Sequence, residues 1–118
     1  EPIGPKRMFD VLIVVPCTGN TLAKLSHGIT DTTAAMAVKS HLRSERPVVL
    51  ALSTNDALAA SAENIGRLLN RRHYYFVPFG QDDPESKPRS LVSELSLLPE
   101  TMEAALEGRQ LQPILVSF

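Results

Sequence analysis

The stretch Val11-Leu12-Ile13-Val14-Val15-Pro16-Cys17-Thr18-Gly19-Asn20-Thr21 decides the fold class. Its first five residues are apolar and rich in β-branched side chains, a pattern typical of a strand buried on both faces of a parallel sheet. A short polar loop follows, and then Leu22, Leu25 and Ile29 recur at helical spacing, which predicts a helix from Asn20 or Thr21 to Gly28. A buried strand that leads through a short loop into a helix is the repeating unit of α/β proteins.

The same alternation continues along the chain. We expect a second helix from about Asp31 to about Arg43, with Asp31 or Thr32 as its N-cap. A buried strand over Pro47 to Leu52 and a loop at Ser53 to Asp56 follow. Next we expect a helix with Leu58, Ala62, Ile65 and Leu69 on its inner face, followed by a strand over Tyr74 to Phe79. A polar loop over Gly80 to Ser90 leads to two helical pieces, over Ser90 to Leu98 and Pro99 to Leu106. The chain is expected to close with an extended tail over Gln110 to Phe118. This order predicts a three-layer α/β/α sandwich with a parallel sheet, Rossmann-like or flavodoxin-like.

Three strands are few for such a sheet, and the chain opens on Glu1-Pro2-Ile3-Gly4-Pro5-Lys6 instead of on a methionine. We therefore expect that the N-terminal β-α portion of the domain is missing and that residues 1–118 form its C-terminal part.

Composition excludes several classes of function. The 12 Lys and Arg residues nearly balance the 13 Asp and Glu residues, which gives no electrostatic reason to expect nucleic acid as a partner. The longest apolar run, Val11 to Val15, is too short to span a bilayer. The single cysteine, Cys17, cannot form an internal disulfide and suits a reducing compartment, so we expect a cytoplasmic protein.

Two polar loops carry the chemistry that the sequence suggests. Ligands of doubly wound folds bind at the carboxyl ends of the strands, where the loops at Pro16 to Thr21 and Ser53 to Asp56 share one rim. In the first loop, Gly19 permits close approach of a ligand, the side chains of Thr18, Asn20 and Thr21 offer polar groups, and the following helix directs free N–H groups at the loop. The pattern fits a phosphate cradle, but taken alone it favours a capped helix that binds no ligand.

Other polar residues are assigned structural roles. Cys17 is expected to be a small core residue, because no base adjoins it. We interpret His27, His41 and His73 as surface or capping side chains. Arg71 and Arg72 are interpreted as a solvated helix end, and Asp82 and Asp83 as solvated acids. Lys87 and Arg89, in contrast, are candidates for contact with an anionic substrate. We expect no metal site.

The first loop also carries a family resemblance. Pro16-Cys17-Thr18-Gly19-Asn20-Thr21 resembles the Pro-Ala-Ser-Ala-Asn-Thr motif of the homo-oligomeric flavin-containing cysteine decarboxylases, and Gly28-Ile29-Thr30-Asp31 resembles that superfamily's step into its next helix. One branch, the B subunits of dipicolinate synthases from spore-forming bacteria, is most similar. Pro16 to Thr32, Ser53 to Asp56, Phe76 to Asp82 and Glu107 to Pro113 carry this likeness.

The resemblance implies an FMN site. It places the phosphate near Thr18, Gly19 and Thr21, Asn20 beside the flavin ring, and Ser53, Thr54 and Asn55 in a second contact segment. Only Asn55 matches the decarboxylases' Pro-x-Met-Asn segment, and the family's first strand, its FMN-binding turn and its active-site histidine have no counterpart, so the resemblance identifies no catalytic residue.

The resemblance also implies a reaction and its partners. The branch oxidises a dihydrodipicolinate-type precursor, a small dicarboxylate, to dipicolinate during sporulation, in the cytoplasm of the mother cell. The A subunit of the same synthase supplies the NAD(P) site, and a homo-oligomer, trimeric or larger, is expected. Two alternatives remain open: a flavin-dependent decarboxylase or prenyltransferase relative, and a non-catalytic scaffold that binds the A subunit.

Overall fold

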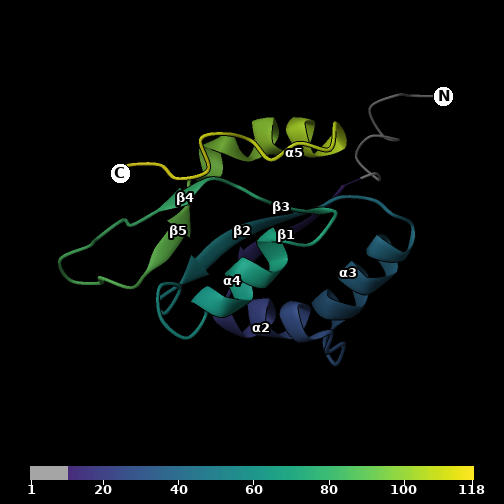
Figure 1. Cartoon of the computed structure of the whole chain (residues 1–118), viewed down its shortest axis with the longest axis horizontal. Helices are drawn as coiled ribbons and strands as arrows, with labels where there is room; N and C mark the ends of the chain where they lie inside the picture. Colours follow the sequence, from purple (N-terminus) through teal and green to yellow (C-terminus); the bar gives the residue numbers. More distant parts are fainter. Residues whose placement is uncertain (1–10) are drawn as a thin grey trace.

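The computed structural model describes residues 11–118, so the expectation for Glu1 to Lys6 lies outside the described residues. The elements in chain order are β1 (Leu12–Cys17), α2 (Gly19–His27), α3 (Thr33–Arg43), β2 (Val48–Thr54), α4 (Ala62–Leu69), β3 (Tyr74–Phe76), β4 (Phe79–Gly80), β5 (Leu91–Ser93), the 3₁₀ turn η1 (Leu95–Leu97) and α5 (Leu98–Leu106) (Figure 1). Two predicted helix boundaries are confirmed. Gly28 adopts a left-handed conformation with φ of 72° after α2, and Thr32 caps the start of α3.

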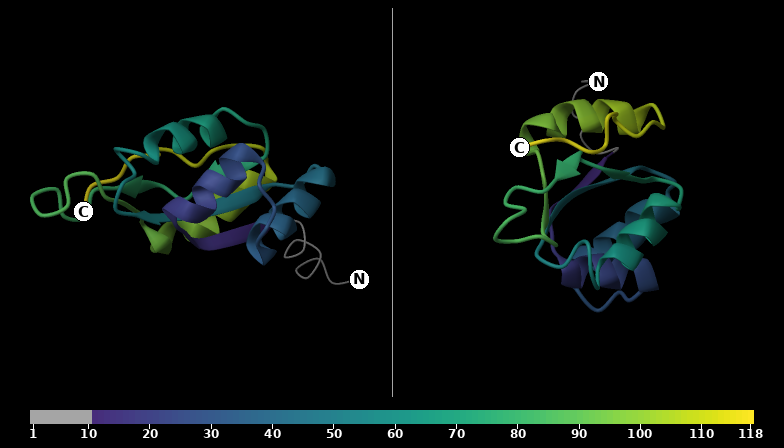
Figure 2. Two further views of the ribbon diagram at one scale, coloured as in Figure 1. Left: turned by 90° about the horizontal axis from the view of Figure 1, so that it is seen from below. Right: turned by 60° about the vertical axis from the view of Figure 1, so that its left-hand side comes forward.

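A five-stranded sheet forms the centre of the molecule. β1, β2 and β3 are parallel, with Leu12 opposite Val48 on one side of β2 and Tyr74 opposite Val48 on the other. The helices α2, α3 and α4 cover one face of this sheet, and α5 covers the other face (Figure 2). The predicted α/β class and its three layers are therefore confirmed.

The apolar run of β2 fills both layers of the core. Val48, Leu50 and Leu52 lie in the cluster beneath α2, α3 and α4, whereas Val49 and Ala51 lie in the cluster beneath α5. Successive strand side chains point to opposite faces, so a central strand covered on both sides must be apolar at every position. Burial on both faces explains why the sequence of β2 is a continuous apolar run and does not alternate between apolar and polar residues.

The sheet is mixed because an antiparallel pair extends it. β5 pairs with the end of β2, with Ser53 opposite Val92, and β4 pairs with β5. The prediction of helix over Ser90 to Leu98 is therefore wrong at its start. Leu91 and Ser93 turn inward and become buried as they complete the sheet beyond the end of β3.

The predicted inner face of α4 is also partly wrong. The helix begins at Ala62, after turns over residues 57–61, and it buries Ile65 and Leu68. Leu58 and Leu69 are about half exposed, at 50% and 46%. Leu58 precedes the helix, so its seven-residue spacing from Ile65 does not place the two side chains on one helical face.

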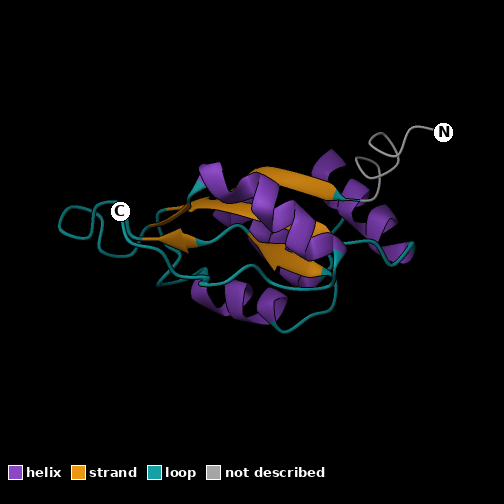
Figure 3. Ribbon diagram, turned by 90° about the horizontal axis from the view of Figure 1, so that it is seen from above, coloured by secondary structure: helices purple, strands orange, loops and turns teal. Residues whose placement is uncertain are grey.

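The loop over residues 81–90 is the connection between β4 and β5, and it projects from one end of the molecule (Figures 1 and 3). Hydrogen bonds within the loop hold its shape, including Lys87 N to Asp83 O at 2.7 Å and Gln81 Nε2 to Pro88 O at 2.8 Å. Among residues 11–118, no helix combines the length and apolar character needed to cross a membrane.

Candidate functional site

The carboxyl ends of β1 and β2 meet at one edge of the sheet. The two strands are parallel and Cys17 lies opposite Leu52, so the segments that follow them emerge side by side. A Cβ atom built on Gly19 would lie 3.0 Å from Oγ1 of Thr54, the last residue of β2 and part of the predicted segment Ser53 to Asp56. The structure thus brings together the two loops that the sequence singles out.

Thr18 shapes the first loop as the N-cap of α2. Its backbone is extended, its carbonyl accepts from Leu22 N at 2.8 Å, and its Oγ1 accepts from Thr21 N at 3.4 Å. The cap therefore satisfies part of the first turn. The N–H groups of Gly19 and Asn20 are left as donors at the positive end of the helix dipole.

The second loop is organised around the Asp56 carboxylate. Oδ1 of Asp56 accepts from Thr54 Oγ1 at 2.6 Å and from Ser61 Oγ at 2.8 Å. These hydrogen bonds, with Thr54 first and Ser61 second, lower the pKa of Asp56 below its ordinary value. The carboxylate is therefore ionised at neutral pH, and it lies 3.2 Å from the Cβ position of Gly19.

Exposure separates the predicted site residues into two groups. Thr54 is buried and its hydroxyl is engaged by Asp56, so Thr54 and Gly19 form the floor where the loops touch. The accessible polar side chains of the two loops are those of Thr18, Asn20, Ser53 and Asn55, with Thr21 partly exposed. We call these five residues the rim.

The rim offers groups that fit part of a flavin. Two amide side chains, three hydroxyls and the open first turn of α2 can donate to and accept from a ring edge, a ribityl chain or a phosphate. The Asp56 carboxylate adds negative charge beside Gly19, which disfavours a phosphate on that side. A phosphate at α2 would have to lie away from Asp56, next to Asn20 and Thr21.

Asp56 and Ser61 are the site residues that sequence reasoning missed. The sequence marks Asp56 only as one residue of a loop rich in helix-capping types, and Ser61 carries no signal. Thr54 and Asp56 stand two apart, the spacing of a local side-chain turn, so this half of the cluster could have been found. Ser61 reaches it only through the turns over residues 57–61.

Cys17 is a core residue, as predicted. Its side chain is fully buried, and burial raises the pKa of its thiol to about 12. A thiol that remains protonated at neutral pH is a poor nucleophile. Across residues 11–118, no group of three or more His, Cys, Asp or Glu side chains could hold a metal ion.

The interpretation of Arg71 as a purely solvated helix end is wrong. Its guanidinium donates to Leu25 O at 3.2 Å and to Ser26 O at 2.7 Å. These carbonyls lie in the last turn of α2, so the positive charge complements the dipole of a neighbouring helix instead of its own.

Comparison with known proteins identifies the family of this chain. Residues 1–104 match the family model described as Flavoprotein. The chain belongs to the flavoprotein family. It is 50% identical over 116 residues to the B subunit of dipicolinate synthase from Bacillus subtilis, and this match covers 98% of the present chain and 58% of that protein. The predicted resemblance to these B subunits is confirmed.

Two solved structures resemble this flavoprotein chain. The B subunit of dipicolinate synthase from Bacillus halodurans is 48% identical, with a TM-score of 0.91 over 99% of this chain and 60% of that one. The FMN-dependent cysteine decarboxylase SpaF is 28% identical, with a TM-score of 0.56 over 81% of this chain and 52% of that one. The chain thus spans about three fifths of the length of the dipicolinate synthase proteins that it matches.

Proposed function

We propose that this chain is the FMN-binding B subunit of a dipicolinate synthase, which takes part in the oxidation of a dihydrodipicolinate-type precursor to dipicolinate during sporulation. One observation carries the proposal: Gly19 packs against Thr54, so the first and second loops form a single polar rim at the carboxyl ends of β1 and β2. The identity to a named B subunit supports the substrate class, and the family supports a flavin. This location is the one that α/β folds use for nucleotide ligands.

In this proposal each part of the rim has its own task. The N–H groups of Gly19 and Asn20 and the hydroxyls of Thr18 and Thr21 hold the phosphate end of FMN, on the side away from Asp56. The amides of Asn20 and Asn55, together with the Ser53 hydroxyl, orient the flavin ring. A bound flavin supplies two-electron redox chemistry, and the protein supplies binding and orientation.

The test is a fluorescence titration of the full-length protein with FMN. Removal of one hydrogen bond costs about 0.5–1.5 kcal/mol, so Asn20→Ala should weaken binding about 3- to 10-fold. Thr18→Ser keeps both the cap and the hydroxyl and should bind FMN like the wild type, whereas Thr18→Ala should bind it more weakly. The matched controls are Thr33→Ala and Asn70→Ala, at the exposed first residue of α3 and the exposed C-cap of α4, away from the rim. Equal affinity in all the variants would refute the placement of FMN at the rim.

A flavin-dependent decarboxylase is the second candidate, supported by the likeness to SpaF. Counted back from Asn55, the positions that match proline and methionine in the decarboxylase motif are Leu52 and Thr54 here, which favours the dipicolinate branch. The two candidates predict different products. Release of carbon dioxide from a cysteine-containing peptide would support the decarboxylase, and flavin-dependent formation of dipicolinate together with the A subunit would support the leading proposal.

Partner subunits follow from the same proposal. We propose that an A subunit binds NAD(P) and that the B subunits assemble as trimers or larger homo-oligomers in the mother-cell cytoplasm. We also propose that Lys87 or Arg89 of the projecting loop contacts the dicarboxylate. Analytical ultracentrifugation with and without the A subunit tests the assembly. Tight complex formation by a flavin-free preparation would instead favour a non-catalytic scaffold.

A further inference from the structure

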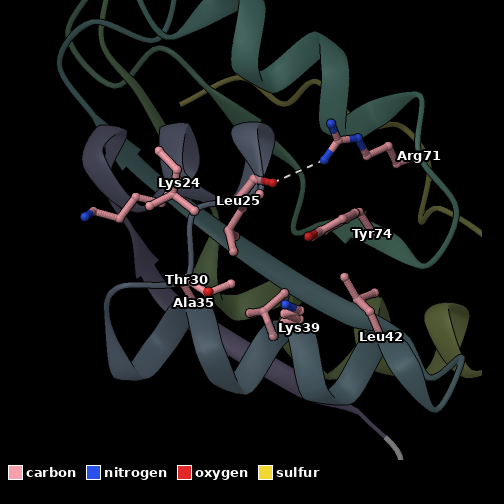
Figure 4. A pocket seen from close by; sticks show the side chains of 11 residues that line it. Lys24, Leu25, Thr30, Ala35, Lys39, Leu42, Arg71 and Tyr74 are labelled. Carbon is pink, nitrogen blue, oxygen red and sulfur yellow. Dashed lines mark hydrogen bonds between the residues drawn. The ribbon is translucent and has the colours of Figure 1, made fainter.

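A cavity lies at the other end of α2 from the rim. It has a volume of about 220 Å³ and opens between α2, α3 and the start of β3 (Figure 4). Its apolar walls come from Leu25, Val38 and Tyr74, which are 5%, 1% and 8% exposed, and from Leu42. The cavity is smaller than the range of about 300–1,000 Å³ that is typical for drug-sized ligands, so it suits a small molecule.

The Tyr74 hydroxyl points into this cavity (Figure 4). Tyr74 is more than nine-tenths buried, and none of the described residues forms a hydrogen bond with its hydroxyl. The ring is buried while the hydroxyl opens onto the cavity, so a ligand in the cavity can accept a hydrogen bond from it. Desolvation by burial raises the pKa of Tyr74, so the hydroxyl remains protonated and can donate.

Positive charge surrounds the same cavity. The Arg71 guanidinium is fixed above it by the carbonyls of Leu25 and Ser26 and retains further N–H donors. The Lys39 side chain lines it from α3, and its ammonium group has no ion-pair partner within the described part of the chain. Lys24 turns its ammonium away, toward Asp31 at 2.5 Å. No acidic side chain of the described residues lines the cavity.

We propose that this cavity is a second binding site, specific for a small organic carboxylate. The apolar body of the ligand lies among Leu25, Val38 and Leu42, and its carboxylate accepts a hydrogen bond from Tyr74, with Lys39 and Arg71 supplying the positive charge. A neutral molecule of the same shape would leave these charges uncompensated. Because the cavity and the rim lie at opposite ends of α2, this site does not depend on the proposed flavin site.

The probe is benzoate, titrated into the full-length protein and followed by amide chemical shifts, with benzamide as its neutral analogue. We expect saturable binding of benzoate at millimolar concentrations, with the largest shifts at residues 24–30 and 71–74, and no saturation with benzamide. Tyr74→Phe removes only the hydroxyl and should weaken benzoate binding at least about 10-fold, because it removes a hydrogen bond to a charged carboxylate. Lys39→Gln should weaken it severalfold.

The control is Arg109→Gln, which also removes one positive charge but at an exposed position after α5, on the other face of the sheet, and should bind benzoate like the wild type. Addition of saturating FMN should leave the benzoate affinity unchanged. The proposal is overturned if the wild type shows no saturable binding, if Tyr74→Phe and Lys39→Gln both bind benzoate as tightly as the wild type, or if FMN displaces benzoate. Displacement by FMN would place benzoate at the rim and leave the flavin proposal intact.

Discussion

At the scale of single residues, Gly19 and Asp56 determine how the two loops meet. Gly19 has no side chain, so β2 can extend to Thr54 while Thr54, Asp56 and Ser61 close around the backbone of the first helical turn. The hydroxyls of Thr54 and Ser61 donate to Asp56, and the carboxylate in turn lies near the positive end of α2. Close approach of backbone is therefore the physical reason for glycine at this position.

Gly19→Ala should destabilise the fold. The new Cβ would lie 3.0 Å from both Ser61 Oγ and Thr54 Oγ1, so hydrogen-bonded groups would have to move apart. Overpacking of this kind costs about 1–3 kcal/mol in the free energy of unfolding. Gly66→Ala is the control, because a Cβ atom at Gly66 meets nothing within 4 Å and an alanine inside α4 should stabilise by up to about 1 kcal/mol. Urea unfolding measures both; equal effects of the two changes would contradict the assigned contact.

The lowered pKa of Asp56 makes a prediction about acid stability. A carboxyl group with a folded-state pKa below its unfolded value stabilises the protein above the unfolded value, and this contribution disappears as pH falls through the folded-state pKa. Asp56→Asn should therefore be less stable than the wild type at pH 7, and the difference should shrink below about pH 4. Because Asp56 is exposed, we expect a difference of less than about 1 kcal/mol. Thermal unfolding from pH 3 to pH 7 tests this, and a difference that is independent of pH would count against it.

At the scale of elements, Ser93 joins two strands through its side chain. Its Oγ accepts from Leu52 N at 2.8 Å and donates to Val77 O at 3.0 Å. The hydroxyl thereby satisfies two backbone groups at the point where β3 has ended and the pairing of β5 with β2 takes over. The serine acts as a polar bridge within an otherwise apolar sheet.

Ser93→Ala should leave both of these backbone groups without a partner. Each buried unsatisfied group costs about 1–3 kcal/mol, so the free energy of unfolding should fall by at least about 2 kcal/mol. Ser26→Ala is the matched control. Ser26 is 1% exposed and its hydroxyl has no partner among the described residues, so its removal should be close to neutral. Chemical denaturation tests the pair, and a loss of stability as large in Ser26→Ala as in Ser93→Ala would refute this account.

The elements also show what the sequence can predict and what it cannot. The runs at Val11 to Val15 and Pro47 to Leu52 both predict strands, but only β2 is buried on both faces. The expectation of full burial is wrong for β1, which is partly exposed and leaves Val15 51% exposed. Gly28 marks a helix end through its backbone and Thr32 marks a helix start through its side chain. The sequence at Leu91 to Ser93 wrongly predicts a helix, because this segment becomes a strand only by pairing with the end of β2, which is distant in the sequence. The rim is predictable because parallel strands end at one edge, whereas the position of Ser61 depends on turns with no local signature.

At the scale of the whole molecule, the C-terminal tail connects the α5 layer to the edge of the sheet. Phe79 N donates to Ile114 O at 2.9 Å, and Val116 N donates to Phe79 O at 3.0 Å, so the tail runs beside β4. Upstream, the Gln110 side chain exchanges two hydrogen bonds with the backbone of Phe76, at 2.8 Å and 2.6 Å, and covers the edge of β3. The last residues therefore complete the sheet, although they form no strand longer than one bridge.

Gly80 permits this close approach of the tail, and its substitution tests the arrangement. A Cβ atom at Gly80 would lie 2.2 Å from the backbone oxygen of Val116, so Gly80→Ala should displace the tail. We expect a loss of about 1–3 kcal/mol and faster hydrogen exchange at Val116. Deletion of Ile114 to Phe118 should itself destabilise the protein, and in that shortened protein Gly80→Ala should cost much less, because the clashing atom is gone. If Gly80→Ala costs the same in both backgrounds, the tail is not what requires glycine, and the backbone of β4 itself must require it.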